Sequence, residues 1–234
     1  MSGAAALASF EAEVTACRAC PRLVEWRETV AREKRAAFRD WTYWGRPIPG
    51  FGDPAARVLI LGLAPAAHGA NRTGRVFTGD RSGDFLFAAL HRTGFANQPT
   101  SRHVGDGLKL RDAWITAAVR CAPPQNKPTP QERDTCLPFA ARELDALADV
   151  RVVVCLGAFA WDAALRLLAA RGVDVPRPRP RFGHLAELQL PDAPHLLGCF
   201  HPSQQNTFTG KLTAAMVDEV LLRARELAGL GAPR

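Results

Sequence analysis

The sequence predicts an α/β fold, with a single domain built around a central four-stranded, mostly parallel sheet that helices flank. Short apolar runs rich in β-branched residues alternate along the chain with longer segments of helical character. Parallel neighbours require a helical crossover, so this alternation favours a parallel sheet. The chain has 234 residues, 47% of them hydrophobic, which suits one large core better than two domains. We therefore expect residues 1–234 to fold as one domain.

Four apolar runs are predicted to form the strands. Their lengths and their content of Val, Ile and Leu are typical of buried strands. The runs are residues 58–63, 113–119, 152–156 and 195–200.

Five segments are predicted to be helical. Thr129 stands before Pro130, which places a good capping residue ahead of a residue favoured at the first helical position. The predicted helices are residues 8–38, 83–92, 130–148, 158–171 and 211–228.

Active sites of such sheets lie where the strands end, at their carboxyl edge. The segments that follow the first, second and fourth strands therefore matter most for function. These are residues 64–80, 120–126 and 201–206.

The charge of the chain favours an anionic partner. The net charge is +7 and the pI is about 9.5, and Arg and Lys bind phosphates with release of counterions. However, the basic residues are 26 Arg and 4 Lys, a bias that the base composition of the genome could also produce. Charge alone leaves nucleic-acid binding open.

No apolar run approaches the roughly 20 residues that a membrane helix needs. The N-terminus also lacks the basic start and the apolar stretch of a signal peptide. We expect a cytoplasmic protein with no membrane partner.

Structural disulfides are not expected in the cytoplasm, so the six cysteines need other roles. Their sequence contexts divide them into two groups. Cys155 and Cys199 lie within apolar strands and should behave as small hydrophobic residues. The other four have spacings typical of a metal site, beginning with a two-residue separation. These are Cys17, Cys20, Cys121 and Cys136. Spacing does not distinguish iron from zinc, and scattered structural cysteines remain the alternative.

The loop after the first strand is rich in small residues and arginines. Arg72 and Arg75 could meet phosphate, Phe77 could stack on a base, and Asp80 lies close to both arginines in the sequence. The loop is not a P-loop, because the Lys-Ser/Thr ending is missing. The alternative is structural: Phe77 in the core and Asp80 as the N-cap of the following helix.

The other two loops carry one polar candidate each. A proline-rich turn presents Asn126, and His201 stands at the end of a strand, before a polar turn that could wedge into a duplex. A lone histidine of this kind is more often structural. Residues 176–182, "PRPRPRF", are predicted to be an extended basic loop.

Taken together, these motifs resemble the iron-sulfur uracil-DNA glycosylases, and most closely the family-five, or type B, branch. The resemblance spans nearly the whole chain and follows the order of the family. It is carried by the N-terminal CxxC, "PGFGDP", "GLAP" with "GxNRTGRxFTGD", "AVRCAPPxNKPTP" with a cysteine 15 positions on, and "HPSxxN".

The resemblance implies an activity, a substrate and a cofactor. It implies hydrolysis of the N-glycosidic bond of uracil, and of other deaminated bases such as hypoxanthine and xanthine, in double-stranded DNA during base-excision repair. It also implies a 4Fe-4S cluster on Cys17, Cys20, Cys121 and Cys136. We expect a monomer associated with the nucleoid.

The resemblance also assigns roles to residues. Asp80, Asn126 and His201 are implied to be catalytic, and Phe77 to be the platform on which the base stacks. The remaining base- or DNA-binding residues that it implies are Gly62, Leu63, Ala64, Pro65, Arg72, Arg75, Ser203 and Asn206.

Three positions depart from the patterns of related families. Ala66 stands where members commonly have Gly, Leu63 where the sister family has Glu, and Ala117 where the sister family has an Asn that reads uracil. A pocket without that Asn lacks one hydrogen-bond test for uracil, which favours a broad range of bases.

Two other classes of function remain open from the sequence. A non-catalytic iron-sulfur module would bind damaged duplex and release no base. A nucleotide hydrolase would use the arginine-rich loop on free phosphate, but no cluster of carboxylates for a metal ion is evident in the sequence.

Overall fold

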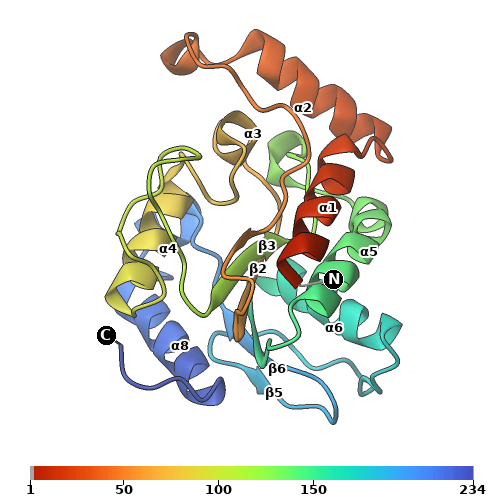
Figure 1. The fold of residues 1–234 in the computed structure, drawn as a ribbon, viewed down its shortest axis with the longest axis vertical. Coiled ribbons are helices and arrows are strands. Elements are labelled where there is room, and N and C mark those ends of the chain that lie inside the picture. The colour runs from red at the N-terminus through yellow and green to blue at the C-terminus, as the bar shows by residue number, and fades with distance from the viewer. Residues whose placement is uncertain (1–2, 234) are drawn as a thin grey trace.

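The computed structural model describes residues 3–233, which form three layers with a sheet between two groups of helices (Figure 1). The sheet has the strand order β1-β3-β2-β4-β6-β5. Its four central strands are parallel. They are β3 (Ala113–Ala117), β2 (Val58–Gly62), β4 (Val152–Leu156) and β6 (His195–Cys199). The predicted α/β fold and its four parallel strands are confirmed.

Two edge strands were not predicted. β1 (Phe51–Gly52) pairs with β3 and β5 (Glu187–Leu188) pairs with β6, both antiparallel. Each has only two residues, which is too short to show a periodic pattern in the sequence. The sheet therefore has six strands, not four.

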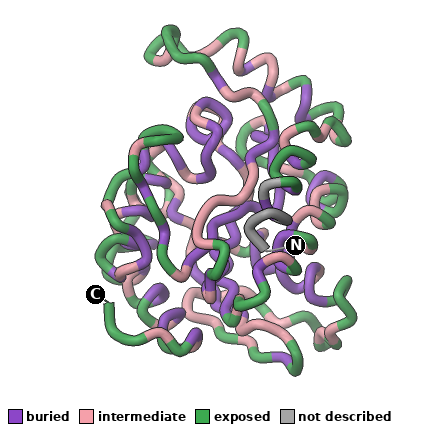
Figure 2. Tube along the Cα trace, in the orientation of Figure 1, coloured by how far each residue is buried: buried purple, intermediate pink, exposed green. Residues whose placement is uncertain are grey.

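The central strands are apolar throughout because helices cover both faces of the sheet. Side chains alternate between the faces. In β2, Val58 and Ile60 pack in the core beside α4 (Arg81–Arg92) and α8 (Ala214–Leu227). Leu59 and Leu61 pack in the opposite core, beside α5 (Pro130–Ala146) and α6 (Ala158–Ala170). Figure 2 shows the buried sheet in the middle of the molecule.

The start of α5 agrees with its prediction. Thr129 Oγ1 accepts a hydrogen bond from the Glu132 backbone N–H at 3.1 Å, and the Glu132 carboxylate accepts one from the Thr129 N–H at 2.8 Å. This reciprocal pair satisfies amide groups that have no partner within the helix.

The predicted long helix over residues 8–38 is wrong in one respect, because it is interrupted. α1 (Gly3–Ala16) ends before Cys17, and α2 (Pro21–Glu33) begins after Cys20. Pro21 cannot donate within a helix and clashes with a preceding turn, so it starts a new helix. A short 3-10 turn, η1 (Ala36–Phe38), follows α2. The break places Cys17 and Cys20 in a bend.

Short helices occur within the three loops at the carboxyl edge. They are α3 (Ala70–Thr73), η2 (Pro124–Asn126) and α7 (Gln204–Phe208). Among the helices of residues 3–233, none combines the length and the apolar character needed to cross a membrane.

Candidate active site

A pocket of about 550 Å³ lies at the carboxyl edge of the sheet. The loops after β2, β3 and β6 all contribute to its wall, as the position of the strand ends predicts. Its lining residues are Leu63, Ala64, Pro65, Ala66, Val76, Phe77, Asp80, Ser82, Asn126, His201, Ser203, Gln204 and Gln205.

Asp80 combines the two roles that the sequence left open. It is the N-cap of α4, where its Oδ1 accepts a hydrogen bond from the Gly83 N–H at 3.0 Å, and its carboxylate also lines the pocket. Burial raises the pKa of Asp80, while the Gly83 and Ser82 amides and the charge of Arg72 lower it. The helix start thus fixes a carboxylate against the pocket.

The space beside Asp80 depends on a glycine. A Cβ atom at Gly69 would lie 2.1 Å from Asp80 Oδ2, well inside van der Waals contact. The absence of a side chain at position 69 therefore lets the backbone lie against the carboxylate.

His201 is half-buried and faces the same pocket. Burial lowers the pKa of His201 to about 4, so its imidazole is neutral at physiological pH. A neutral imidazole carries one N–H donor. This side chain can therefore donate one hydrogen bond into the pocket without carrying a charge.

Phe77 belongs both to the pocket wall and to the edge of the core. Its backbone has φ = +51°, a left-handed conformation that is rare and strained for a bulky residue. The ring lies against Gly62, where a Cβ would approach it to 2.7 Å. The ring centroids of Phe77 and His201 are 6.1 Å apart. One pocket thus brings together an aromatic ring, a half-buried carboxylate and a neutral imidazole.

Asn126 lies at the exposed rim of the pocket. Both Gln125 and Asn126 have positive φ, 55° and 56°, a conformation that Asn adopts more easily than most residues. The stiff proline-rich turn therefore presents this amide to solvent at the pocket mouth.

Two residues after His201 have different roles, since one lines the pocket and the other holds the backbone of the turn. Ser203 lines the pocket and caps α7 by accepting a 3.4 Å hydrogen bond from the Asn206 N–H. The Asn206 side chain points back and donates to the His201 carbonyl at 2.8 Å. Asn206 therefore fixes the turn after His201 and is not among the residues that line the pocket; its contact with DNA stays a prediction.

The sequence suggested that Arg72 and Arg75 could meet phosphate, but both side chains are buried. Arg72 is 4% exposed and Arg75 is 5% exposed. Arg75 forms a 2.7 Å ion pair with Asp106, and Arg72 donates to the carbonyls of His68 and Gly79. Their donors are engaged inside the protein, and the sequence carries no signal of that burial.

Some pocket residues were not singled out from the sequence. Ser82 lies in the first turn of α4, and Gln204 and Gln205 project from α7 at the pocket mouth. A signal was available for the glutamines, since they lie within the polar turn after His201.

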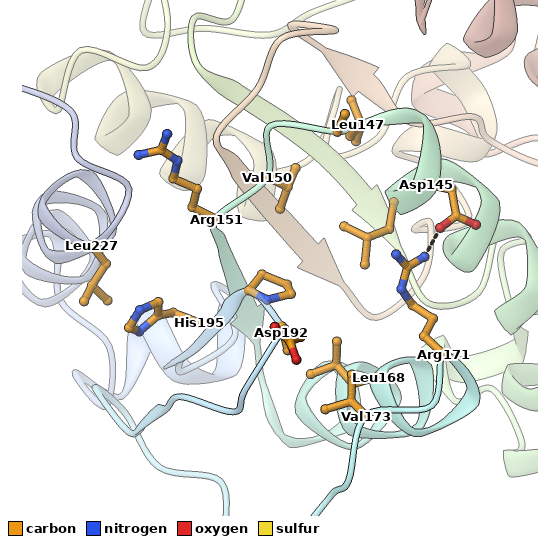
Figure 3. Close-up of a pocket in the computed structure, with 14 residues that line it drawn as sticks. Asp145, Leu147, Val150, Arg151, Leu168, Arg171, Val173, Asp192, His195 and Leu227 are labelled. Atoms are coloured by element: carbon orange, nitrogen blue, oxygen red, sulfur yellow. Dashed lines mark hydrogen bonds and ion pairs between the residues drawn. The ribbon is translucent and has the colours of Figure 1, made fainter.

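A second hollow of about 560 Å³ lies at the opposite, amino edge of the sheet. Figure 3 shows aliphatic side chains, among them Leu168 and Val173, around an ion pair between Arg171 and Asp145. His195 and Arg151 stand near its rim, at the starts of β6 and β4. Here the Asp145 carboxylate is neutralised by Arg171, whereas in the carboxyl-edge pocket Asp80 and a neutral imidazole line one space.

The four predicted metal ligands line one cavity. Cys17 and Cys20 come from the bend between α1 and α2, Cys121 follows β3, and Cys136 lies in α5. Cys155 and Cys199 are fully buried in the sheet, as predicted. Within residues 3–233, no three His, Cys, Asp or Glu side chains are arranged so as to hold a metal ion.

The surroundings of the four thiols fit a thiolate-bound cluster. The Arg27 guanidinium, 2% exposed, donates to Cys121 Sγ at 2.9 Å, and the Arg120 backbone N–H donates to Cys136 Sγ at 3.3 Å. A buried cation is costly without nearby negative charge. Glu28 Oε1 lies 3.7 Å from Arg27 Nη2, and cluster thiolates would add negative charge on the side of Cys121. Burial raises the pKa of the Cys121 thiol to about 11, so without a metal ion this thiol is protonated.

The cysteine cavity and the pocket share a wall. Leu23, Val119 and Cys121 form a small buried cluster, against which Cys20 and Ala64 pack. Ala64 also lines the pocket. The cysteines are therefore in contact with the loop that follows β2.

The fold and the pocket together define an α/β enzyme in which a carboxylate and a neutral imidazole line one pocket at the carboxyl edge of a parallel sheet. The family described as "Uracil DNA glycosylase superfamily" matches residues 49–225. The chain belongs to this superfamily, and the resemblance seen in the sequence is confirmed.

Individual relatives agree with this assignment. A type-5 uracil-DNA glycosylase of Mycobacterium tuberculosis is 56% identical over 229 residues, which cover 97% of this chain and 84% of that protein. One of Thermus thermophilus is 53% identical over 222 residues, covering 95% and 98% of the two chains. A type-4 uracil-DNA glycosylase of Pyrobaculum aerophilum is 31% identical over 130 residues, covering 55% and 58%.

Proposed function

We propose that this chain is a uracil-DNA glycosylase that hydrolyses the N-glycosidic bond of uracil, hypoxanthine and xanthine in double-stranded DNA and leaves an abasic site. The observation that carries the proposal is the pocket in which Asp80 and the neutral His201 lie around the Phe77 ring. We propose that it acts as a monomer on DNA of the nucleoid.

The target base must leave the stack before it can enter such a pocket. Flipping a base costs a few kcal/mol, and the cost is lowest for a mispaired, damaged base. The pocket volume of about 550 Å³ lies in the range of ordinary small-ligand sites. Phe77 then provides a face on which the flipped base stacks.

Cleavage separates charge, since the sugar becomes positive and the leaving base negative. The Asp80 carboxylate suits the sugar side, where it stabilises the developing cation or orients the attacking water. Its Oδ1 is fixed by the Gly83 amide, so the group needs little reorganisation during the reaction.

His201 suits the base side. Because burial lowers its pKa to about 4, it donates a hydrogen bond as a neutral imidazole to the base carbonyl that gains negative charge. The Asn206 amide holds the His201 carbonyl at 2.8 Å and so fixes the backbone that carries the ring. Asn126, at the rim, is placed to hold the flipped nucleotide or the water.

The wall of the pocket supports a broad range of bases. Leu63 lines the pocket with an apolar side chain, and Ala117 is buried at the end of β3 without a polar group. A site that lacks a dedicated hydrogen-bond reader discriminates weakly between bases of similar shape.

The turn 202–206 would enter the space that the flipped base leaves. Gln204 and Gln205 are exposed on α7 at the pocket mouth, where a side chain can replace the missing stacking partner.

We propose that Cys17, Cys20, Cys121 and Cys136 hold a 4Fe-4S cluster. When bound, the cluster would link covalently the α1–α2 bend, the end of β3 and α5, and it would supply no redox step to base release. Fixing the Cys121 segment would also steady the pocket wall. Cys121 packs in the same apolar cluster as Ala64, and it leads into the turn that bears Asn126.

The activity is tested with duplexes that contain one uracil, hypoxanthine or xanthine, followed by alkaline cleavage at abasic sites. We expect strand cleavage at all three bases. Binding to the damaged duplexes without any abasic product would instead identify a non-catalytic module.

The cluster is tested separately, by iron and sulfide content and by visible absorption of protein purified without oxygen. We expect about four irons per chain, lost in Cys121→Ser and retained in Cys155→Ser, whose thiol is buried in the sheet. Stoichiometric zinc with no visible band would contradict the proposal.

A further inference from the structure

Arg72 is a buried cation that the proposed reaction does not use. Its side chain is 4% exposed, and its hydrogen-bond acceptors are backbone carbonyls. Nε donates to the His68 carbonyl at 2.8 Å and Nη2 to the Gly79 carbonyl at 2.8 Å. A guanidinium stays charged in proteins, so a full positive charge is held here.

The two carbonyls frame Asp80. Gly79 directly precedes Asp80, and His68 directly precedes Gly69, whose backbone lies against Asp80 Oδ2. The rigid fork of one guanidinium therefore fixes both segments of chain that position the carboxylate.

Two nearly perpendicular aromatic rings from the segment after α2 pack against the guanidinium. Arg72 Cζ lies 3.9 Å from the Phe38 ring centroid and 4.2 Å from the Trp41 ring centroid. Such contacts attract the cation and keep water from it. Trp41 itself is 37% exposed, so the outer ring borders solvent.

We propose that Arg72, packed against Phe38 and Trp41, is a positioning residue that holds Asp80 in place and keeps its carboxylate ionised for base excision. The proposal rests on the proposed function, because it assumes that Asp80 acts in the reaction as a carboxylate.

The charged and titratable groups near Asp80 act in opposite directions. Burial and Asp84 raise the pKa of Asp80, while the Gly83 and Ser82 amides and Arg72 lower it. His201 faces the same pocket and is neutral above about pH 4. Among these groups, Arg72 is the cation that favours the ionised form.

The direct test is the titration of Asp80 in protein labelled with ¹³C at aspartate carboxyl carbons, with the resonance assigned by its loss in Asp80→Asn. Arg72→Gln removes the charge, and we expect the Asp80 midpoint to rise, because a nearby cation favours the ionised carboxylate. The apparent pKa of the acidic limb of the pH–rate profile for excision should rise in parallel, because less of Asp80 is ionised at a given pH.

Arg72→Lys separates the two parts of the role. It keeps the charge but loses the fork, so the Asp80 midpoint should stay near that of the unchanged protein while kcat falls. Trp41→Ala exposes the guanidinium to solvent, which screens its charge, and we expect a smaller rise of the midpoint.

Arg225→Gln is a matched control. Arg225 is 8% exposed, donates to the Gly231 carbonyl at 2.7 Å, and lies 5.1 Å from the Phe95 ring centroid, but it is in α8 and does not line the pocket. This variant should lose stability without any shift of the Asp80 midpoint.

The outcomes are distinguishable. An unchanged Asp80 midpoint in Arg72→Gln, with Asp80→Asn inactive, overturns the role of Arg72 and leaves the proposed function intact. An active Asp80→Asn overturns the role of Asp80 itself. If Arg72→Gln does not fold, Trp41→Ala and Phe38→Leu decide: an unchanged midpoint in both overturns the proposal.

Discussion

The two edges of the sheet carry hollows of nearly equal volume and different chemistry. The carboxyl-edge pocket has about 550 Å³ and the amino-edge hollow about 560 Å³. In the first, the half-buried carboxylate of Asp80 and the neutral imidazole of His201 line the same space. In the second, Arg171 is paired with Asp145, and the remaining wall is largely aliphatic. The kind of polar group that lines the hollow, and not the volume of the hollow, marks the active edge.

The largest effect is expected for Asp80→Asn. Loss of the carboxylate should slow excision of uracil from duplex DNA by at least about 10³-fold, since it removes the group that faces the sugar cation. Asn is as good an N-cap as Asp, so α4 and DNA binding should be kept. Single-turnover rates and gel-shift binding measure the two. Near-normal excision would show that the Asp80 carboxylate is not needed for catalysis at the carboxyl edge.

His201→Ala should have the next largest effect, a loss of about 10²-fold in the rate of base release. The imidazole is neutral at pH 6 and at pH 8, because burial lowers its pKa to about 4. The loss should therefore be the same at both pH values. A loss that appears only below pH 6.5 would mean that the histidine acts as a cation.

A smaller effect is expected on the salt dependence of DNA binding when arginines near one edge or the other are replaced. Arg177 and Arg181 are exposed in the basic loop 176–182, which is tied to the carboxyl edge by the Phe182–Phe200 contact, with centroids 6.1 Å apart. Each phosphate contact contributes about 0.9 to the slope of log K against log salt. Replacing both by Ala should lower that slope by up to about 2.

The matched control is Arg111→Ala with Arg151→Ala. Both arginines are exposed and stand just before β3 and β4, at the amino edge, and the double variant removes the same charge. We expect its salt slope to change by less than about 0.5. Equal losses in the two double variants would mean that the protein binds DNA through its overall charge.

The smallest effect is expected for His195→Ala, at the rim of the amino-edge hollow. Excision should stay within about twofold, since surface substitutions away from special features change stability by only about 0.5 kcal/mol. Steady-state rates on uracil-containing duplex measure this. A tenfold loss would indicate a functional role for the amino edge.

The central strands and the three loops could be predicted from the sequence because their signals are local. Runs such as Val58–Gly62 are apolar throughout, and polar residues follow directly after the strands. Asp80 was also predictable, since a capping residue and a pocket carboxylate can share one position.

Burial of polar side chains could not be predicted in the same way. Arg72 and Arg75 belong to the same loop as Asp80, and nothing in the sequence shows that aromatic rings or Asp106 enclose them. These contacts join residues about 30 positions apart. The inward turn of Asn206 toward the His201 carbonyl is likewise a tertiary contact.

Gly69 has a consequence for how related sequences should be read. Any side chain at this position would collide with Asp80 Oδ2, although the change leaves the acid, the amide and the imidazole of the site in place. A homologue that lacks only this first glycine of the "GxNRTGRxFTGD" motif could therefore keep every proposed catalytic side chain and still be a poor enzyme. Position 69 is a useful checkpoint when activity is assigned to newly sequenced genomes.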